Sequence, residues 1–227
     1  MPAPLSIIIP TLNAANDIGP CLAALTEGLG AGLVRELIIT DGGSDDDIMA
    51  VADEAGAVFL TGKPGRGAQL SRAALASRGR WFLFLHADTV LAKNWSDAVL
   101  RHLQENPDKA GYFDLRFDAK GTKPRLVAGW ANLRSRLFGL PYGDQGLLIS
   151  AQLYKNIGGY QSIPLMEDVD IARRLSKRLA PLNHIVVTSA IRYQRDGWLT
   201  RGWRNLSTVA LYYAGRSPEK LAKRYLR

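Results

Sequence analysis

The stretch ELIITDGGSDDD at residues 36–47 decides the fold of this chain. Its first part, Glu36 to Thr40, is short, apolar at its centre and β-branched, which is typical of a buried parallel strand. Asp41 follows at the strand end, and Gly42 and Gly43 allow the backbone to turn. The acidic and hydroxyl residues after them are good helix caps. The stretch therefore predicts a strand, a tight polar turn and a helix in succession.

The same order recurs along the first hundred residues. Further strands are expected at 5–9, 57–60 and 81–85, and helices are expected at 15–27, 46–55, 68–77 and 94–104. This alternation predicts an α/β fold with a mostly parallel central sheet, right-handed crossovers and flanking helices. The alternation fails after about residue 110, where later strands are expected at 112–117, 147–150 and 185–188.

Composition supports a globular protein with one large domain. The 227 residues are 47% apolar and 22% charged, which excludes a disordered or collagen-like chain. Cys21 is the only cysteine, so an intrachain disulfide and a cysteine-based metal cluster are excluded. No uncharged apolar run approaches the roughly 20 residues that span a bilayer. We therefore expect a cytoplasmic protein that does not cross a membrane.

The net charge of +8 is concentrated near the C-terminus. Residues 1–170 carry a charge of −3, whereas residues 171–227 carry +11. Aromatic residues accompany the basic ones between 200 and 214, a composition that can lie in a membrane interface. The preferred interpretation is a terminal helical segment that packs onto the rest of the chain. The alternative is peripheral membrane contact through 200–227, at the inner face of the cell membrane, with a lipid-linked acceptor.

Polar residues follow each of the first four expected strands. In an open parallel sheet the carboxyl ends of the strands form the ligand crevice, so these residues are expected to converge. Together with the apolar Pro10 and Ala87 that accompany them, the residues expected at the site are Thr11 and Asn13 after the first strand, Asp41 after the second, Arg66 and Gln69 after the third, and His86 and Asp88 after the fourth.

Three of these positions suggest chemistry. Asp88 could be a plain turn residue, but with Asp41 it could also surround a divalent cation and the phosphates that this cation neutralises. Arg66 lies between two glycines at the start of a helix, where an anion can bind, although a plain loop explains it as well. Farther along, Glu167 and Asp168 open a helix, where negative charge suits the helix dipole or supplies a general base.

Taken together, the motifs resemble those of family 2 glycosyltransferases, over about residues 4–195. SIIIPTLNA (6–14) is similar to the opening strand and loop of that family, ELIITDGGSDD (36–46) to its nucleotide-binding strand, and FLHADT (84–89) to its metal motif. YGDQGLLIS (142–150) and GGYQSIPLMEDVD (158–170) resemble its acceptor-side and catalytic segments. The resemblance implies a GT-A-like nucleotide-diphospho-sugar transferase fold and an inverting, metal-dependent sugar transfer, with a UDP-sugar favoured, as in small bacterial members without membrane spans.

The resemblance also implies residue roles. Thr11 and Asn13 would contact the nucleoside, Asp41 the base, and Asp88 would bind Mn²⁺ or Mg²⁺. His86 replaces the first acid of the common Asp-x-Asp form and could contact ribose, order a water on the metal or end the strand; Gly42 replaces another common acid. Asp168 would be the general base with Glu167 orienting it or the acceptor. Asp144 and Gln145 would line the sugar or acceptor pocket, and a loop of Arg192, Arg195 and Trp198 would close on the diphosphate.

The expected organisation is a catalytic domain at 1–195, with a nucleotide-binding half at about 1–109 and an acceptor half at about 110–195, followed by a basic helical extension at 196–227. The partners implied are a nucleotide-sugar donor and an acceptor that the motifs do not specify, with no nucleic acid. Two other functions fit parts of the pattern. A sugar-phosphate nucleotidyltransferase shares the nucleotide-binding layout, and a non-enzymatic basic binding module explains the C-terminal charge but leaves the acidic residues without a role.

Overall fold

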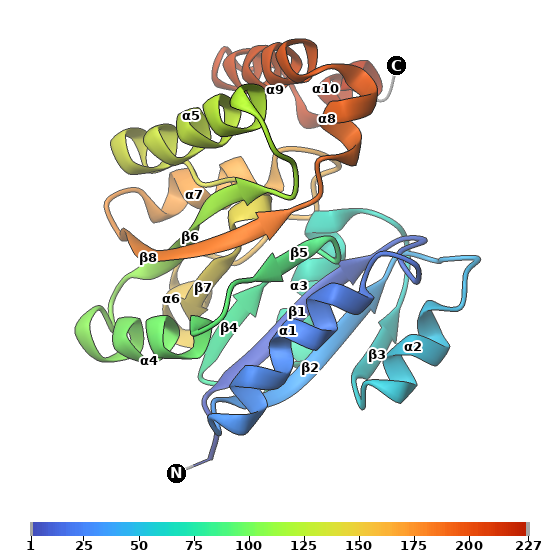
Figure 1. The fold of residues 1–227 in the computed structure, drawn as a ribbon, viewed down its shortest axis with the longest axis vertical. Helices are drawn as coiled ribbons and strands as arrows, with labels where there is room; N and C mark the ends of the chain where they lie inside the picture. The colour runs from blue at the N-terminus through green and yellow to red at the C-terminus, as the bar shows by residue number, and fades with distance from the viewer. Residues whose placement is uncertain (1, 226–227) are drawn as a thin grey trace.

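A central sheet organises residues 2–225, the part of the chain that the computed structural model describes (Figure 1). The first half contains β1 (Leu5–Thr11), α1 (Gly19–Gly30), β2 (Val34–Asp41), α2 (Ile48–Glu54), β3 (Val58–Thr61), α3 (Arg66–Ala76), β4 (Trp81–Phe84), β5 (Thr89–Leu91) and α4 (Trp95–Glu105). The second half contains β6 (Ala110–Phe117), α5 (Thr122–Phe138), the 3-10 turn η1 (Gly143–Gln145), β7 (Leu147–Ser150), α6 (Ala151–Asn156), α7 (Glu167–Leu175), β8 (Leu179–Thr188), α8 (Ile191–Asp196), α9 (Trp198–Tyr213) and α10 (Pro218–Tyr225).

Within these residues the strands form one eight-stranded sheet in the order β3-β2-β1-β4-β7-β6-β8-β5. The first four strands pair in parallel, as the alternating pattern predicts. Antiparallel pairs enter with β7, which joins β4 to β6, and with β5, which pairs with β8. The carboxyl ends of β1, β2 and β4 consequently lie at one edge of the sheet.

Two hydrophobic cores lie on opposite faces of the sheet. Leu5, Ile7 and Ile9 of β1 belong to the cluster beneath α1 and α4, whereas Ile8 belongs to the cluster beneath α3, α6 and α7. Successive side chains of a strand point to opposite faces, so an unbroken apolar run is what a strand covered on both sides requires. This burial holds the strand ends, and the loops that follow them, in fixed positions.

Some boundaries differ from the expected ones. The first helix begins at Gly19 rather than at residue 15, because Asp17 and Ile18 first form a turn onto the Ala14 carbonyl and Pro20 lies in the first helical turn. The strand β5 was not expected, because its three residues are too few to show a strand-like alternation of side chains. The long helix α5 lies between two of the expected later strands, where the sequence pattern specifies no element.

The basic C-terminal segment is helical and packs onto the domain up to residue 225, while residues 226–227 lie outside the described residues. The ring of Phe117 in β6 meets Tyr193 and Trp198 at centroid distances of 4.8 and 5.0 Å. Leu221 of α10 is buried against Met166 and Val169. The helices α8 to α10 thereby cover the edge of the sheet where the strand-end loops lie (Figure 1). Between residues 2 and 225, no helix has the length and apolar character needed to span a bilayer.

Candidate active site

The loops that follow β1 and β2 are tied together by hydrogen bonds. Asn13 accepts a hydrogen bond from the Asp45 amide through its Oδ1, 2.9 Å away, and its own amide donates to Ser44 Oγ at 2.7 Å. Thr11 Oγ1 donates to Asp41 Oδ1 at 2.9 Å. The structure thus brings Thr11, Asn13 and Asp41 together at the carboxyl edge, as the strand pattern predicts.

Asp41 is buried and its carboxylate is already used by its own loop. The Gly43 and Ser44 amides both donate to Oδ2 at 2.7 Å, and the Ser44 hydroxyl donates to Oδ1. Burial acts to raise the pKa of Asp41, but these hydrogen bonds and that from Thr11 outweigh it and lower the pKa. Asp41 therefore holds the turn as an anion, and a contact with a nucleotide base stays a prediction.

Gln69 and Pro10 support this loop cluster from behind. Gln69 is buried, and its Nε2 donates to the Thr11 and Thr40 carbonyls at 2.8 Å each, which ties α3 to the ends of β1 and β2. Pro10 lies beyond the last β1 residue that pairs with β4, where its missing N–H breaks no ladder bond to that strand. Both residues shape the loops, and Gln69 has little surface left for a ligand.

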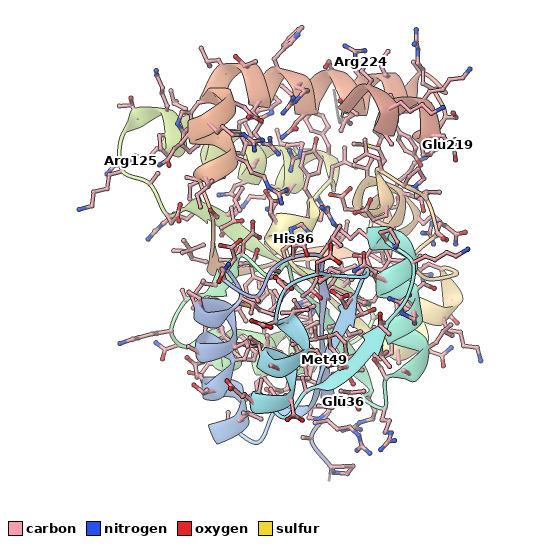
Figure 2. All side chains as sticks on the ribbon, turned by 90° about the vertical axis from the view of Figure 1, so that its right-hand side faces the viewer. Glu36, Met49, His86, Arg125, Glu219 and Arg224 are labelled. Carbon is pink, nitrogen blue, oxygen red and sulfur yellow. The ribbon has the colours of Figure 1, made fainter. Side chains whose placement is uncertain are left out.

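A cavity of about 160 Å³ lies between the end of β4, η1, the start of α7 and the helices α8 and α9. The described residues that line it include none of the loop cluster of Thr11, Asn13 and Asp41. Figure 2 shows His86 near the middle of the molecule, between the N-terminal half and the C-terminal helices. The charged and titratable residues that line the cavity include most of the residues to which the motifs assign chemistry: Arg66, His86, Asp88, Asp144, Glu167, Asp168 and Arg192.

His86 and Asp88 follow β4 and differ in their electrostatic setting. Burial, together with the nearby charges of Arg66 and Arg192, lowers the pKa of His86 well below its usual value, so its ring is neutral at neutral pH. A side chain on Gly143 would meet the His86 ring at 2.5 Å, which shows how closely this turn packs against it. Burial raises the pKa of Asp88, while Arg192 and Arg66 oppose the shift.

Asp144 lies in η1, next to this pair. Burial raises its pKa to about 6, opposed by Arg134 and reinforced by the negative charges of Asp168 and Asp88. Its Oδ1 is shielded from solvent and has no hydrogen-bond partner among the described residues. A carboxylate in that position is costly to the folded chain unless a cation or a ligand donor approaches it.

This cost makes a testable difference to stability. The pKa of Asp144 is about 6 in the folded chain against an ordinary value of 3.8, so the folded state loses stability as the pH rises through that interval. We expect Asp144→Asn to raise the free energy of unfolding by about 3 kcal/mol at pH 7.5 and by less than about 1 kcal/mol near pH 4, where the folded-state carboxyl is protonated. Urea unfolding of metal-free protein at both pH values measures this, with the exposed Asp53→Asn as control. Equal stability of the variant and wild type at pH 7.5 would contradict the assignment.

The carboxylates of α7 are held in two ways. Asp168 Oδ2 accepts from the Gly143 amide at 3.0 Å and Oδ1 from the Val169 amide at 2.8 Å, so the carboxylate is fixed at the cavity wall. Glu167 is buried and pairs with Arg66 at 3.1 Å. Burial raises the pKa of Glu167, and Arg66 lowers it. Glu167 thus anchors Arg66 at the start of α3, where the helix N-terminus also favours an anion.

The residues of this site fit a divalent cation that a bound substrate would also help to coordinate. Among residues 2–225, no three His, Cys, Asp or Glu side chains converge to form a metal cage. Asp88 and the shielded Oδ1 of Asp144 are nevertheless hard oxygen donors in an acidic cavity. Mg²⁺ and related ions often bind through one or two carboxylates plus substrate phosphates and water. The residues present fit this arrangement, in which substrate and water complete the coordination, rather than a metal cage made by the protein alone.

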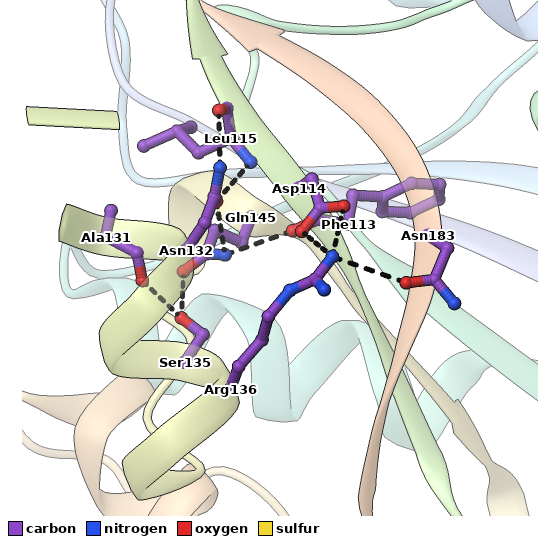
Figure 3. Close-up of polar contacts among 9 residues, drawn as sticks. All are labelled: Phe113, Asp114, Leu115, Ala131, Asn132, Ser135, Arg136, Gln145 and Asn183. Carbon is purple, nitrogen blue, oxygen red and sulfur yellow. Dashed lines mark hydrogen bonds and ion pairs between the residues drawn. The ribbon is translucent and has the colours of Figure 1, made fainter. Parts of the chain in front are cut away.

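Gln145 does not line the cavity. It is fully buried, accepts a hydrogen bond from Ser135 Oγ at 2.6 Å and donates through Nε2 to the Phe113 carbonyl at 3.0 Å (Figure 3). It joins η1 to α5 and β6, next to the bonds of Asn132 to Leu115. The sequence motif placed Gln145 beside Asp144, but the 3-10 turn points the two side chains in different directions.

The expected basic and aromatic loop is helical: Arg192 and Arg195 lie in α8, and Trp198 begins α9. Arg192 lines the cavity. Arg195 is exposed and pairs with Asp196 at 2.7 Å, away from the cavity. Trp198 stacks on Tyr193 and packs on Phe117 in the core. Of the three residues, the structure therefore places only Arg192 where it could meet a diphosphate.

Several lining residues were not singled out from the sequence. Tyr142, whose ring centroid lies 3.3 Å from the Arg134 guanidinium, directly precedes the GDQG string, and the motif assigns it no role. Arg201 and Asn205 reach the cavity from α9. They follow no strand and belong to no motif, so only tertiary packing reveals them.

Comparison with known proteins identifies the family of this chain. Residues 6–146 match the model for glycosyl transferase family 2. Over 95 residues the chain is 34% identical to a glucosyl-3-phosphoglycerate synthase of Mycolicibacterium paratuberculosis. The matched region covers 38% of this chain and 29% of that relative. The chain thus matches less than a third of the length of that curated relative.

Solved structures share the fold. The S. aureus TarS 1–349 structure in complex with UDP-GlcNAc superimposes with a TM-score of 0.63 at 14% identity, over 82% of this chain and 58% of that one. The glucosyl-3-phosphoglycerate synthase of Mycobacterium tuberculosis, in complex with Mn²⁺, UDP-glucose and phosphoglyceric acid, gives 0.58 at 22% identity, over 82% and 70%. Because the family model spans more than half of the chain, this protein belongs to glycosyl transferase family 2, with a GT-A-like fold.

Proposed function

We propose that this glycosyltransferase moves a sugar from a UDP-sugar to an acceptor hydroxyl with inversion, and that Asp168 is the general base. The observation that carries the proposal is the convergence of Asp88 and Asp168 with Arg66 and Arg192 in one cavity at the carboxyl edge of the sheet. One wall offers a fixed carboxylate, and the same cavity offers cations for a diphosphate.

The donor is inferred from chemistry and from the relatives together. Two structurally similar proteins were solved with UDP-GlcNAc and with UDP-glucose, which supports uridine as the nucleoside of the donor. In this chain, the loop cluster of Thr11, Asn13 and Asp41 would contact the nucleoside, and Arg192 would meet the diphosphate. Asp88 would hold a Mn²⁺ or Mg²⁺ ion, which would supply positive charge for the leaving diphosphate.

The step itself is a single displacement. Asp168 would take the proton of the acceptor hydroxyl as its oxygen forms a bond to the anomeric carbon of the sugar. The bond between that carbon and the diphosphate oxygen breaks, and UDP leaves with the bonding electrons. The incoming and leaving oxygens lie on opposite sides of the carbon, so its configuration inverts. Two backbone amides hold Asp168 in place for this task, and Glu167 keeps Arg66 beside it.

Nucleotide titration tests the proposal most directly. We expect calorimetry to show that UDP binds at least tenfold more tightly than GDP or CDP, and more tightly with Mn²⁺ than without it. Incubation with UDP-glucose or UDP-GlcNAc should release UDP and no pyrophosphate, which separates sugar transfer from nucleotidyl transfer. Absence of binding by all three nucleotides, with or without Mn²⁺, would refute the proposed function.

A further inference from the structure

An apolar groove of about 410 Å³ runs between α5 and α9, which lie side by side over the C-terminal half of the sheet (Figure 1). The residues that give it its character are large and apolar: Leu126, Trp130, Trp198, Leu199, Trp203 and Leu206. The reaction derived above uses none of them.

The groove lies next to the reaction cavity. Tyr142, Asp144, Tyr193 and Asn205 line both hollows, so the apolar groove and the charged cavity share one wall. A molecule that placed a hydroxyl near Asp168 could extend into the groove without leaving the protein surface. This continuity connects the groove to the acceptor side of the reaction.

The two helices also expose apolar side chains around the groove. On α5, Leu126 is 72% exposed and Trp130 46%, and they lie four residues apart on one face. On α9, Leu199 is 80% exposed and Trp203 74%, again four residues apart. Contiguous exposed apolar surface of this kind usually marks a binding site. A groove walled by such residues suits a hydrocarbon chain.

Charge and shape favour a chain over a protein partner. The charged and polar lining of the cavity suits a polar head group, while the groove beside it is apolar. A second copy of this chain would need a complementary face of about 800 Å². A concave slot that leads to the reacting carboxylates instead matches an elongated amphiphile with its polar end at the cavity.

We propose that the acceptor of this enzyme is an amphiphile whose alkyl or isoprenoid chain occupies the groove between α5 and α9 while its polar head lies in the cavity. This inference rests on the proposed function, since it names the class of acceptor for the same site. The groove would contribute to acceptor affinity and to the position of the head, and it would play no part in donor binding.

Gly202 provides a sharp test, because it lines the groove and a Cβ built on it meets no atom within 4 Å. Gly202→Leu should fill the groove without disturbing the core. Gly129→Leu is the matched control, because Gly129 lies on α5 outside the groove and its Cβ also meets open space. Both changes place leucine in a helix, where it is favoured over glycine.

The probes are n-hexyl, n-octyl and n-decyl phosphate, each kept below its micelle concentration and titrated calorimetrically in the presence of UDP and Mn²⁺. For wild type and Gly129→Leu we expect the affinity to rise about threefold to fourfold per added methylene. For Gly202→Leu we expect this dependence on chain length to be lost while UDP affinity stays unchanged.

Three outcomes would overturn the inference. The first is an affinity that does not change with chain length in wild type, and the second is an affinity series that Gly202→Leu leaves unaffected. The third is a wild-type dimer that Gly202→Leu makes monomeric while the affinity does not depend on chain length, which would assign the groove to a second copy. Each can occur with normal UDP binding, in which case the proposed function stands. Loss of UDP binding in the wild type itself would instead refute the proposed function.

Discussion

Asp168→Asn is expected to lower kcat by a factor of about 10² to 10⁴, the usual contribution of a general base. The amide cannot take the proton of an acceptor hydroxyl, whereas Arg66, Arg192 and Asp88 would continue to bind the donor. Calorimetry should therefore give a UDP affinity close to that of wild type, and steady-state kinetics should show the loss in kcat rather than in KM for the donor.

Position and proton transfer can be separated at this residue. Two backbone amides donate hydrogen bonds to the two carboxylate oxygens of Asp168. Asparagine has one side-chain oxygen in place of two, so part of the loss in kcat could come from a displaced side chain. Asp168→Ala assayed with added formate removes that ambiguity, because a small carboxylate that restores part of the rate is replacing a base. Asp170→Asn is the matched control, since Asp170 lies in the same helix turn but pairs with Arg174 outside the cavity. A kcat for Asp168→Asn within threefold of wild type would exclude Asp168 as the base.

The fold could be predicted where one local pattern dictated one local structure. The strands β1 and β4 and the second half of β2 are buried on both faces, so their sequences are mainly apolar runs that end in polar turns. The strand β5 could not be predicted, because its three residues depend on pairing with β8, about a hundred residues later in the chain. The same holds for the order of β7, β6 and β8, which long-range pairing decides.

The site was predicted as positions on the backbone rather than as side-chain directions. Strand-end placement correctly brought Thr11, Asn13 and Asp41 into one loop cluster. It could not show that Gln69 and Gln145 turn inward to satisfy backbone carbonyls, because either direction fits the same sequence. Nor could it show Asn205, which reaches the cavity only because α9 packs over the sheet.

Asp88→Asn is expected to weaken UDP binding in the presence of Mn²⁺ by about 100-fold. A carboxylate about 4 Å from a cation contributes roughly 4 kcal/mol per pair of unit charges at an effective dielectric of 20, and the asparagine oxygen recovers only part of it. Without Mn²⁺ the sign should reverse. The variant removes a negative charge that repels the diphosphate, so metal-free UDP should bind it at least as tightly as wild type.

Opposite changes in UDP affinity with and without Mn²⁺ distinguish a metal ligand from a residue that merely shapes the turn after β4. A structural defect would weaken UDP binding with and without Mn²⁺ alike. The exposed Asp97→Asn on α4 removes the same charge far from the cavity and should change neither titration. Burial raises the pKa of Asp88, so the Mn²⁺ effect in wild type should also decline as the pH falls, because protonation competes with the cation for the same oxygens. If Asp88→Asn kept a full Mn²⁺ enhancement at neutral pH, the metal would have to bind elsewhere, and Asp144, with its unpaired Oδ1, would be the next carboxylate to test.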